Sequence, residues 1–260
     1  MSTRFRLISR LSKSLRDINY AGSRPMSQKL LLRPLCTRYR TPTVQTFNHT
    51  CTHSTMAHTT FPTDIPAPTD DGACNHLPGL KLPSIPLPST AGNTVDISTL
   101  AGLTVLFCYP RTGGPNETIT EEWNQIPGAR GCTPQACSFR DASKEFLTLG
   151  VSHIFGASTQ GTAYQRELKE RMHLPYQLLS DEKLELAQAL NLPTFEWQGS
   201  KLIKRLTMAI EDGEVIKVFY PVFPPDQSAN EVLKWLGTYD GRKNLSTEGE
   251  NQTTRNMQKK

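Results

Sequence analysis

Apolar and polar positions alternate along residues 91–240 in a way that predicts one α/β domain. Apolar runs of strand length occupy residues 103–109, 151–157, 176–179, 202–210 and 215–220. Apolar residues recur at helical spacing in residues 134–149, 162–172, 184–190 and 229–236. This order predicts parallel crossovers followed by an antiparallel hairpin, whose tight turn is marked by Asp212-Gly213. We therefore expect a mixed central sheet flanked by helices on both faces.

Residues 103–109 are apolar except for Thr104, and this run ends at Pro110. Such a run is typical of a central strand that is covered on both sides. It is followed by a long loop over residues 111–130, which contains several glycines and prolines. Loops of this length in a compact domain are usually functional or mobile.

The two ends of the chain differ from this domain in composition. Residues 1–40 carry ten Lys or Arg and one acidic residue, Asp17. Residues 1–55 are therefore interpreted as a disordered mitochondrial presequence, with a merely basic tail as the alternative and Met56 as a possible start of a cytosolic form. Residues 56–90 contain seven prolines and are predicted to be a linker. Residues 241–260 are polar without periodicity and are predicted to be a disordered tail.

The net charge of +5 comes from the first residues, so the domain itself is mildly acidic. This distribution argues against a nucleic-acid-binding function. No apolar run is long enough to cross a bilayer, so we expect no stable membrane insertion. No secretion signal accompanies the six cysteines, and any disulfide is therefore expected to be catalytic or redox-sensing.

Cys132 is the candidate nucleophile because it precedes Pro134, and proline is favoured in the first turn of a helix. Unpaired N–H groups at a helix start stabilise a thiolate, and Arg130 adds positive charge nearby. A thiolate in that position can attack a peroxide O–O bond. The same N–H groups can then stabilise negative charge on the leaving oxygen.

Cys137 follows five residues later. In an intact helix the two Cα atoms would be about 8 Å apart, which is beyond the ~7 Å reach of a disulfide. If the two sulfurs bond, the first helical turn must unwind after Cys132 becomes a sulfenic acid. The alternative is that both are ordinary buried cysteines. A metal site is disfavoured because Cys132 and Cys137 lack a second paired motif, and His153 and His173 are interpreted as structural residues.

The stretch Gly131-Cys132-Thr133-Pro134-Gln135-Ala136-Cys137-Ser138-Phe139-Arg140-Asp141 resembles the active-site helix of Q-type, or bacterioferritin-comigratory, peroxiredoxins. Phe107-Cys108-Tyr109-Pro110 resembles the end of the preceding strand, and the resemblance covers about residues 75–240. It implies a thioredoxin-like fold, a peroxidatic Cys132, a resolving Cys137 and no cofactor. It also implies an arginine near the thiolate, for which Arg205 is the candidate. A solvated strand charge is the alternative, since only one of Lys204 and Arg205 can face the site.

One part of the family pattern is absent. Peroxiredoxins usually carry Pro-x-x-x-Thr-x-x-Cys, but Ala129 and Gln125 stand at the Thr and Pro positions relative to Cys132. Pro110 and Thr112 lie about twenty residues upstream, as if a loop had been inserted into the motif. We expect Thr112 to deliver its hydroxyl to the peroxide if the loop folds back. The segment at residues 220–225 would then be either a pocket wall or a rigid connector.

These observations predict a peroxidase that reduces hydrogen peroxide and organic hydroperoxides. Its disulfide would be recycled by a thioredoxin- or glutaredoxin-type reductant, and the chain would be a monomer or homodimer. A thiol–disulfide oxidoreductase is the first alternative, although that chemistry usually uses Cys-x-x-Cys. A non-enzymatic redox sensor on the same fold is the second.

Overall fold

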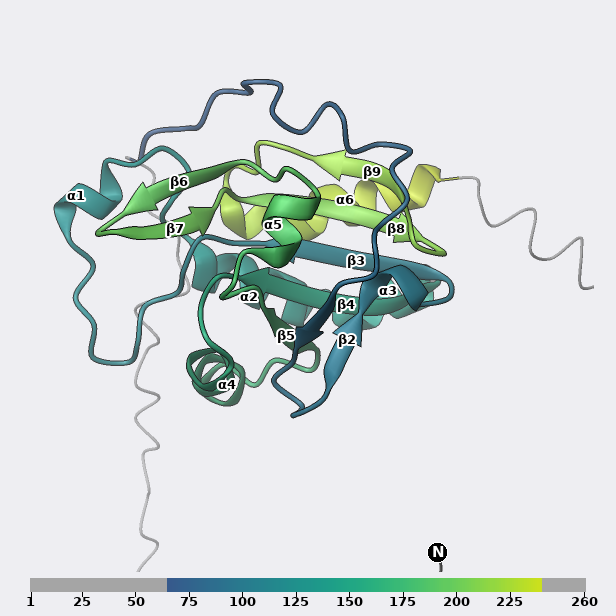
Figure 1. Ribbon diagram of the computed structural model, residues 1–260, viewed down its shortest axis with the longest axis horizontal. Coiled ribbons are helices and arrows are strands. Elements are labelled where there is room, and N and C mark those ends of the chain that lie inside the picture. The colour runs from purple at the N-terminus through teal and green to yellow at the C-terminus, as the bar shows by residue number, and fades with distance from the viewer. Residues whose placement is uncertain (1–64, 240–260) are drawn as a thin grey trace, which may run out of the picture. The chain divides into compact units, whose positions relative to one another are not determined.

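The computed structural model describes residues 65–239, which form a mixed five-stranded sheet in the order β5-β4-β3-β8-β9 (Figure 1). The pairs β3–β4 and β4–β5 are parallel, whereas β3–β8 and β8–β9 are antiparallel. This arrangement confirms the predicted mixed sheet. The strands are β3 Leu103–Cys108, β4 Val151–Ser158, β5 Gln177–Ser180, β8 Leu206–Glu211 and β9 Glu214–Phe219.

Helices cover both faces of the sheet, with α5 in front of it and α6 behind it in Figure 1. Side chains of α2, α3, α4 and α6 pack in one apolar cluster, and those of α5 pack in the other. The helices are α2 Cys132–Asp141, α3 Ser143–Thr148, α4 Thr162–Arg171, α5 Glu185–Ala189 and α6 Ser228–Thr238. Short 3-10 turns occupy Ile97–Thr99 and Pro225–Gln227.

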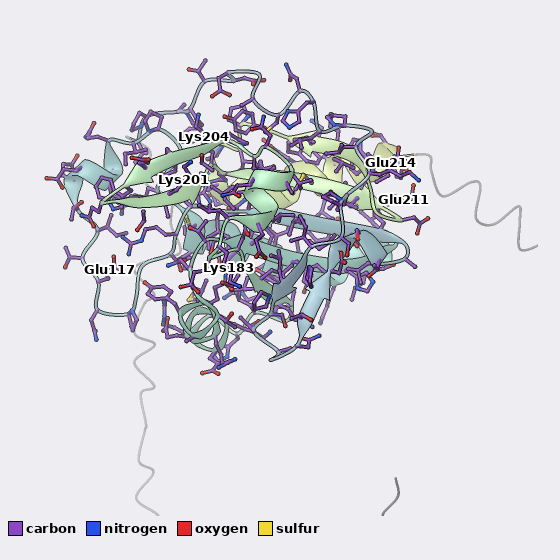
Figure 2. The ribbon with its side chains drawn as sticks, viewed as in Figure 1. Glu117, Lys183, Lys201, Lys204, Glu211 and Glu214 are labelled. Atoms are coloured by element: carbon purple, nitrogen blue, oxygen red, sulfur yellow. The ribbon has the colours of Figure 1, made fainter. Side chains whose placement is uncertain are left out.

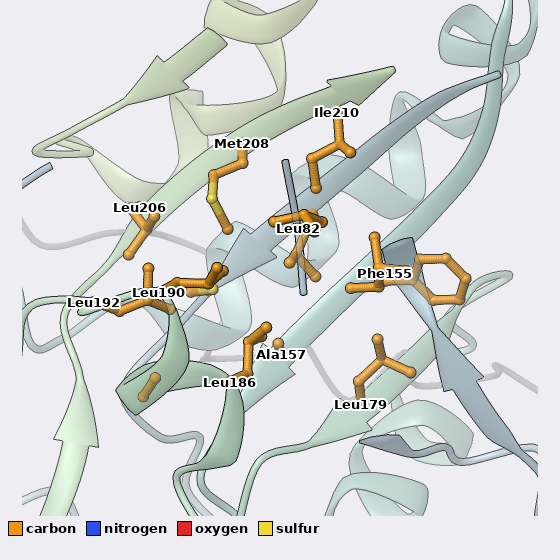
Figure 3. Close-up of a cluster of buried hydrophobic side chains, with 14 of the residues drawn as sticks. Leu82, Phe155, Ala157, Leu179, Leu186, Leu190, Leu192, Leu206, Met208 and Ile210 are labelled. Carbon is orange, nitrogen blue, oxygen red and sulfur yellow. The ribbon is translucent and has the colours of Figure 1, made fainter. Parts of the chain in front are cut away.

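Strand β3 organises the two layers because it is buried along its whole length. Successive side chains of a strand point to opposite faces. Val105 and Phe107 accordingly join the cluster under α2, and Leu106 and Cys108 join the cluster under α5. Figure 3 shows this second cluster, which contains Met208 and Ile210 of β8 together with Leu186 and Leu190. The unbroken apolar run in the sequence follows from this double coverage.

The prediction that residues 56–90 form a linker is wrong for residues 65–90, the part that the structure describes. Leu77 and Leu87 are fully buried, and Leu82 packs in the cluster of Figure 3. The Gly79 amide donates to the Val215 carbonyl at 2.7 Å. Strand β1 Pro86–Pro88 pairs with β2 Thr94–Asp96. The prolines exclude helix here, but the leucines between them still fill the core, so the domain begins before residue 91.

Two predicted elements are divided in the structure. The helix predicted at residues 134–149 is split at Ala142 into α2 and α3 and begins earlier, at Cys132. The strand predicted at residues 202–210 is split into β7 Ser200–Ile203 and β8, and β7 forms a hairpin with β6 Thr194–Trp197. The loop at residues 111–130 contains a short helix, α1 Glu121–Asn124. The sequence pattern did not predict α1 or β6.

Within residues 65–239, every helix is too short or too polar to traverse a lipid bilayer. The predicted presequence at residues 1–55 and the predicted tail at residues 241–260 lie outside the described residues.

Candidate active site

Cys132 is the first residue of α2, and its side chain is buried behind a tight turn. Gly131 precedes it with a φ of 102°, a left-handed conformation that glycine adopts without the steric cost of a Cβ. The turn places the sulfur at the start of the helix, where backbone N–H groups lack helical partners. Cys132 Sγ also lies 3.5 Å from the Ala129 carbonyl oxygen. The predicted position of Cys132 at a helix start is therefore confirmed.

Arg205 is the cationic side chain that faces this sulfur. It lies between β7 and β8, is 3% exposed, and brings Nη2 to 3.2 Å from Cys132 Sγ. The same nitrogen donates to the carbonyl of Ala129 at 3.0 Å and to that of Arg130 at 3.1 Å. The chain before α2 and the arginine are therefore held together around the sulfur. Arg205 occupies the place expected for it from the sequence, although in a strand break rather than within a strand.

Lys204 points the other way. Its Nζ donates to the Asp71 carboxylate at 2.8 Å on the outer side of the protein, where Figure 2 labels it. Adjacent residues of an extended chain direct their side chains to opposite sides. This alternation explains why one cation of the pair is buried at the sulfur and the other remains partly exposed.

Gln135 is the functional candidate that sequence reasoning missed. It is fully buried on α2, three residues after Cys132, and its Oε1 accepts a hydrogen bond from Arg205 Nη1. Its Nε2 donates to Ser228 Oγ at 3.3 Å, and Ser228 shares a 3.2 Å hydrogen bond with Thr207. A polar residue on the same helical face as Cys132 was the available signal, because residues three apart on a helix are neighbours. Gln135 therefore fixes the orientation of the guanidinium.

Cys137 lies on the same helix but faces different surroundings. It borders a hollow of about 400 Å³ with polar neighbours that include Ser138, Arg140 and Asp141. Its side chain is 5% exposed, and burial raises the pKa of its thiol. Cys132 and Cys137 are both free, as are the other cysteines of residues 65–239, Cys74 and Cys108. An intact α2 thus keeps the two sulfurs in separate environments.

Thr112 is hydrogen-bonded to Gln160. Its hydroxyl donates to Gln160 Oε1 at 3.1 Å, and its backbone N–H donates to the same oxygen at 2.9 Å. Gln160 Nε2 in turn donates to the Thr112 carbonyl at 3.0 Å. Within the described chain, no hydrogen bond joins Thr112 to Cys132 or Arg205. The role of Thr112 toward the peroxide stays a prediction, and in this structure its hydroxyl is engaged by Gln160.

The long loop folds instead onto the β6–β7 hairpin. Trp123 of α1 is buried, and its ring centroid lies 5.2 Å from that of Trp197 and 6.1 Å from that of Phe195. Ala129 and Leu202 complete this small apolar cluster. Since Ala129 is three residues before Cys132, the packing of Trp123 bears directly on the start of α2.

A second hollow, of about 210 Å³, adjoins Arg205. Tyr220, Pro221 and Val222 form part of its wall, so the first half of the segment at residues 220–225 lines a pocket. We call this space the Arg205 hollow. Its other wall residues include Pro68, Pro110, Ile126, Pro127, Phe195 and Lys204.

No group of three or more His, Cys, Asp or Glu side chains within residues 65–239 is arranged to hold a metal ion.

Comparison with known proteins agrees with this geometry. The redoxin family model matches residues 77–233. Peroxiredoxin Bcp of Bacillus subtilis is 30% identical over 167 residues, which cover 61% of this chain and 93% of the relative. The chloroplastic peroxiredoxin Q of Suaeda salsa is 29% identical over 160 residues. The matched residues cover 61% of this chain and 66% of that protein, which is less than two thirds of its length.

A solved structure shows the same fold. The crystal structure of peroxidoxin BcpB from Mycobacterium tuberculosis superposes with a TM-score of 0.52 at 29% identity, covering 64% of this chain and all of that one. With the family model matching more than half of the chain, the protein belongs to the redoxin family, among the peroxiredoxins similar to the Q and Bcp proteins.

Proposed function

We propose that the protein is a thiol-dependent peroxidase in which Cys132 reduces hydrogen peroxide and organic hydroperoxides. The observation that carries this proposal is the contact between Arg205 Nη2 and Cys132 Sγ at 3.2 Å, at the first residue of a helix. A guanidinium and free backbone N–H groups stabilise negative charge both on the sulfur and on the oxygen that leaves. Its relatives from Bacillus subtilis and Suaeda salsa carry the name peroxiredoxin, which supports the same reaction.

The first step is a two-electron displacement. The Cys132 thiolate attacks the terminal oxygen of ROOH, the S–O bond forms and the O–O bond breaks. The alkoxide takes a proton from solvent and leaves as ROH, and Cys132 is left as a sulfenic acid. Arg205 is placed to hold the peroxide and to stabilise the departing oxygen.

The second step forms a disulfide with Cys137. The Cys137 thiol condenses with the sulfenic acid, and water is released. Residues five apart on an intact helix are about 8 Å apart, beyond the ~7 Å reach of a disulfide. The first turn of α2 must therefore unwind, which would also separate Gln135 from Arg205. A thioredoxin- or glutaredoxin-type dithiol then reduces the disulfide by thiol–disulfide exchange.

The test is peroxide-dependent oxidation of NADPH with thioredoxin and its reductase. We expect turnover in the wild type, none in Cys132→Ser, and an internal disulfide between residues 132 and 137 in peptide maps of the oxidised wild type. Cys137→Ser should consume one equivalent of peroxide and then stall with thioredoxin. Steady turnover by Cys132→Ser would refute the assignment of the nucleophile.

Insulin reduction and recycling by thioredoxin separate the two alternatives. A thiol–disulfide oxidoreductase would reduce insulin disulfides without peroxide. A redox sensor would be oxidised once by peroxide and then fail to be recycled by thioredoxin.

We also propose that the protein acts in mitochondria. The support is the excess of ten basic residues over one acidic residue in residues 1–40. N-terminal sequencing of the protein recovered from purified mitochondria tests this proposal. A protein absent from that fraction, or retaining Met1, would contradict it, and one beginning at Met56 would indicate the cytosolic form.

A further inference from the structure

We propose that residues 66–73, which we call the N-terminal strap, restrain the chain just before Cys132 and so slow the unwinding of α2 that forms the disulfide. The positioning residues of the strap are Pro68 and Asp71. The inference rests on the proposed peroxidase function and adds to it residues outside 77–233, the part of the chain that the redoxin family model matches. In Figure 1 the strap belongs to the dark blue stretch along the top of the view.

Pro68 holds the strap against Gly128, which lies four residues before Cys132. A Cβ built on Gly128 would lie 3.2 Å from the Pro68 Cγ and 3.4 Å from the Pro68 Cβ, so the proline ring rests directly on the backbone of this turn. Gly128 has a φ of 74°, a left-handed conformation that glycine adopts without the steric cost of a side chain. The turn and the close approach of the strap therefore both depend on this glycine.

Asp71 fastens the strap at a second point. Its carboxylate accepts hydrogen bonds from Lys204 Nζ at 2.8 Å and from the Tyr220 hydroxyl at 2.8 Å. The hydrogen bond from Lys204, followed by that from Tyr220, lowers the pKa of Asp71 to about 2, so the carboxylate is charged at neutral pH. Lys204 directly precedes Arg205 in the chain. The strap therefore reaches from the chain before α2 to the chain that carries the arginine.

The short segment before Cys132 is thus held by two groups. Arg205 Nη2 donates to the carbonyls of Ala129 and Arg130 at 3.0 and 3.1 Å. The strap packs on Gly128, just before them. Consecutive Cα atoms are about 3.8 Å apart, so Cys132 stays within about 7.6 Å of Arg130 in any conformation. When the first turn of α2 unwinds, this segment is drawn along with Cys132, and the contacts that it loses add to the free energy of unwinding.

The sulfenic acid on Cys132 has two fates, and the strap acts on the choice between them. In the first, the Cys137 thiol attacks the sulfenic sulfur, the S–S bond forms, the S–O bond breaks and water leaves. In the second, the sulfenate attacks another hydroperoxide, a second S–O bond forms, the O–O bond breaks, and alcohol or water leaves a sulfinic acid behind. Only the first fate requires an unwound α2. A strap that favours the folded helix therefore slows the disulfide and raises the yield of sulfinic acid in excess peroxide.

The experiment mixes the reduced protein rapidly with one equivalent of hydrogen peroxide and quenches it with a sulfenic-acid trap. Peptide masses then follow the sulfenic acid and the disulfide between residues 132 and 137 separately. Asp71→Ala removes both hydrogen bonds of the strap carboxylate, and its disulfide should form at least about threefold faster, the change expected for losing an exposed ion pair. The rate at which Cys132 is oxidised should be unchanged, because Arg205 keeps its contact with the sulfur. In excess hydrogen peroxide, the yield of sulfinic acid should fall.

Three further variants make the result specific to the strap. Asp71→Glu keeps the carboxylate and should restore the wild-type rate of disulfide formation. Glu214→Gln removes a different surface ion pair, that with Lys81, whose carboxylate is 43% exposed against 44% for Asp71, and it should change neither rate. Pro68→Ala removes the ring from Gly128 without touching the ion pair and should also speed the disulfide. If Asp71→Ala does not fold, Pro68→Ala decides the question.

The failures are distinguishable. If the wild type forms neither a sulfenic acid nor a disulfide, the proposed function falls and this inference falls with it. If the wild type forms both, but Asp71→Ala and Pro68→Ala form the disulfide no faster, the peroxidase stands and the strap does not restrain α2. The same conclusion holds if Glu214→Gln speeds the disulfide equally or if Asp71→Glu behaves like Asp71→Ala. Slower oxidation of Cys132 in Asp71→Ala would show that the strap acts through Arg205 instead, which also overturns the inference.

Discussion

Gln135 offers the sharpest test of how the site is held together. We propose the substitution Gln135→Met, which keeps the length of the side chain but removes its acceptor for Arg205 Nη1 and its donor to Ser228. Arg205 is 3% exposed, and its Nε already lacks a partner among the described residues. The variant therefore leaves a second nitrogen of a buried cation without its hydrogen bond.

The expected magnitude follows from the charge. A hydrogen bond to a charged group contributes about 1.5–3 kcal/mol. About 1.4 kcal/mol of activation free energy corresponds to a tenfold change in rate. Loss of this hydrogen bond to the guanidinium in the transition state should therefore slow the oxidation of Cys132 roughly 10- to 100-fold. Gln135→Glu should lose less, because a carboxylate still accepts from Arg205.

The assay is rapid mixing of the reduced protein with hydrogen peroxide, followed by acid quenching and a count of remaining thiols. Gln165→Met is the matched control, because Gln165 is equally buried and donates to Ser158 Oγ at 3.0 Å and the Leu179 carbonyl at 2.8 Å, away from Arg205. It should lower stability without slowing the reaction. A folded Gln135→Met that reacts at the wild-type rate would show that Gln135 does not position the arginine.

Three further predictions follow from the same structure. Thr112→Val should leave the rate with peroxide within about twofold of wild type, because the Thr112 hydroxyl is hydrogen-bonded to Gln160. It should lower the free energy of unfolding by roughly 1 kcal/mol in urea titrations. A large loss of rate would show that Thr112 takes part in the reaction. Trp123→Ala should lower the free energy of unfolding by about 3–5 kcal/mol in the same titration, or make the loop sensitive to limited proteolysis, because the buried Trp123 ring packs on the β6–β7 hairpin. Unchanged stability and unchanged cleavage would mean that α1 does not pack on the hairpin. Burial raises the pKa of Cys74 to about 12, so in the folded protein at about pH 7.5 iodoacetamide should label Cys132 well before Cys74, as measured by peptide mass. Early labelling of Cys74 would contradict the raised pKa of its thiol.

Much of the fold could be predicted because its signals are local. The apolar run of β3 predicted a doubly covered central strand, and Asp212-Gly213 predicted the hairpin between β8 and β9. The sequence pattern predicts residues 65–90 wrongly, because the prolines exclude a helix but do not show that the leucines between them are buried. Leu77 and Leu87 are buried by contacts with distant strands, which no local pattern records.

The residues of the site also differ in whether their signals are local in the sequence. Cys132 was found because a cysteine before a proline at a helix start is a local signal, and Arg205 was found through the family resemblance together with strand alternation. The position of Thr112 could not be predicted, because it depends on Gln160, 48 residues away in sequence. Gln135 was missed because its meaning depends on Arg205, 70 residues away.

The two ends of the long loop are fastened independently. Thr112, shortly after the end of β3, is hydrogen-bonded to Gln160. Ala129, just before the start of α2, accepts a hydrogen bond from Arg205. Residues 115–120 between them are exposed. Glu117 in this stretch is hydrogen-bonded to Tyr164, and Thr120 caps α1, so residues 118 and 119 are the point at which the loop can be lengthened without disturbing either contact. The same two residues are a suitable position for inserting a fluorescent reporter.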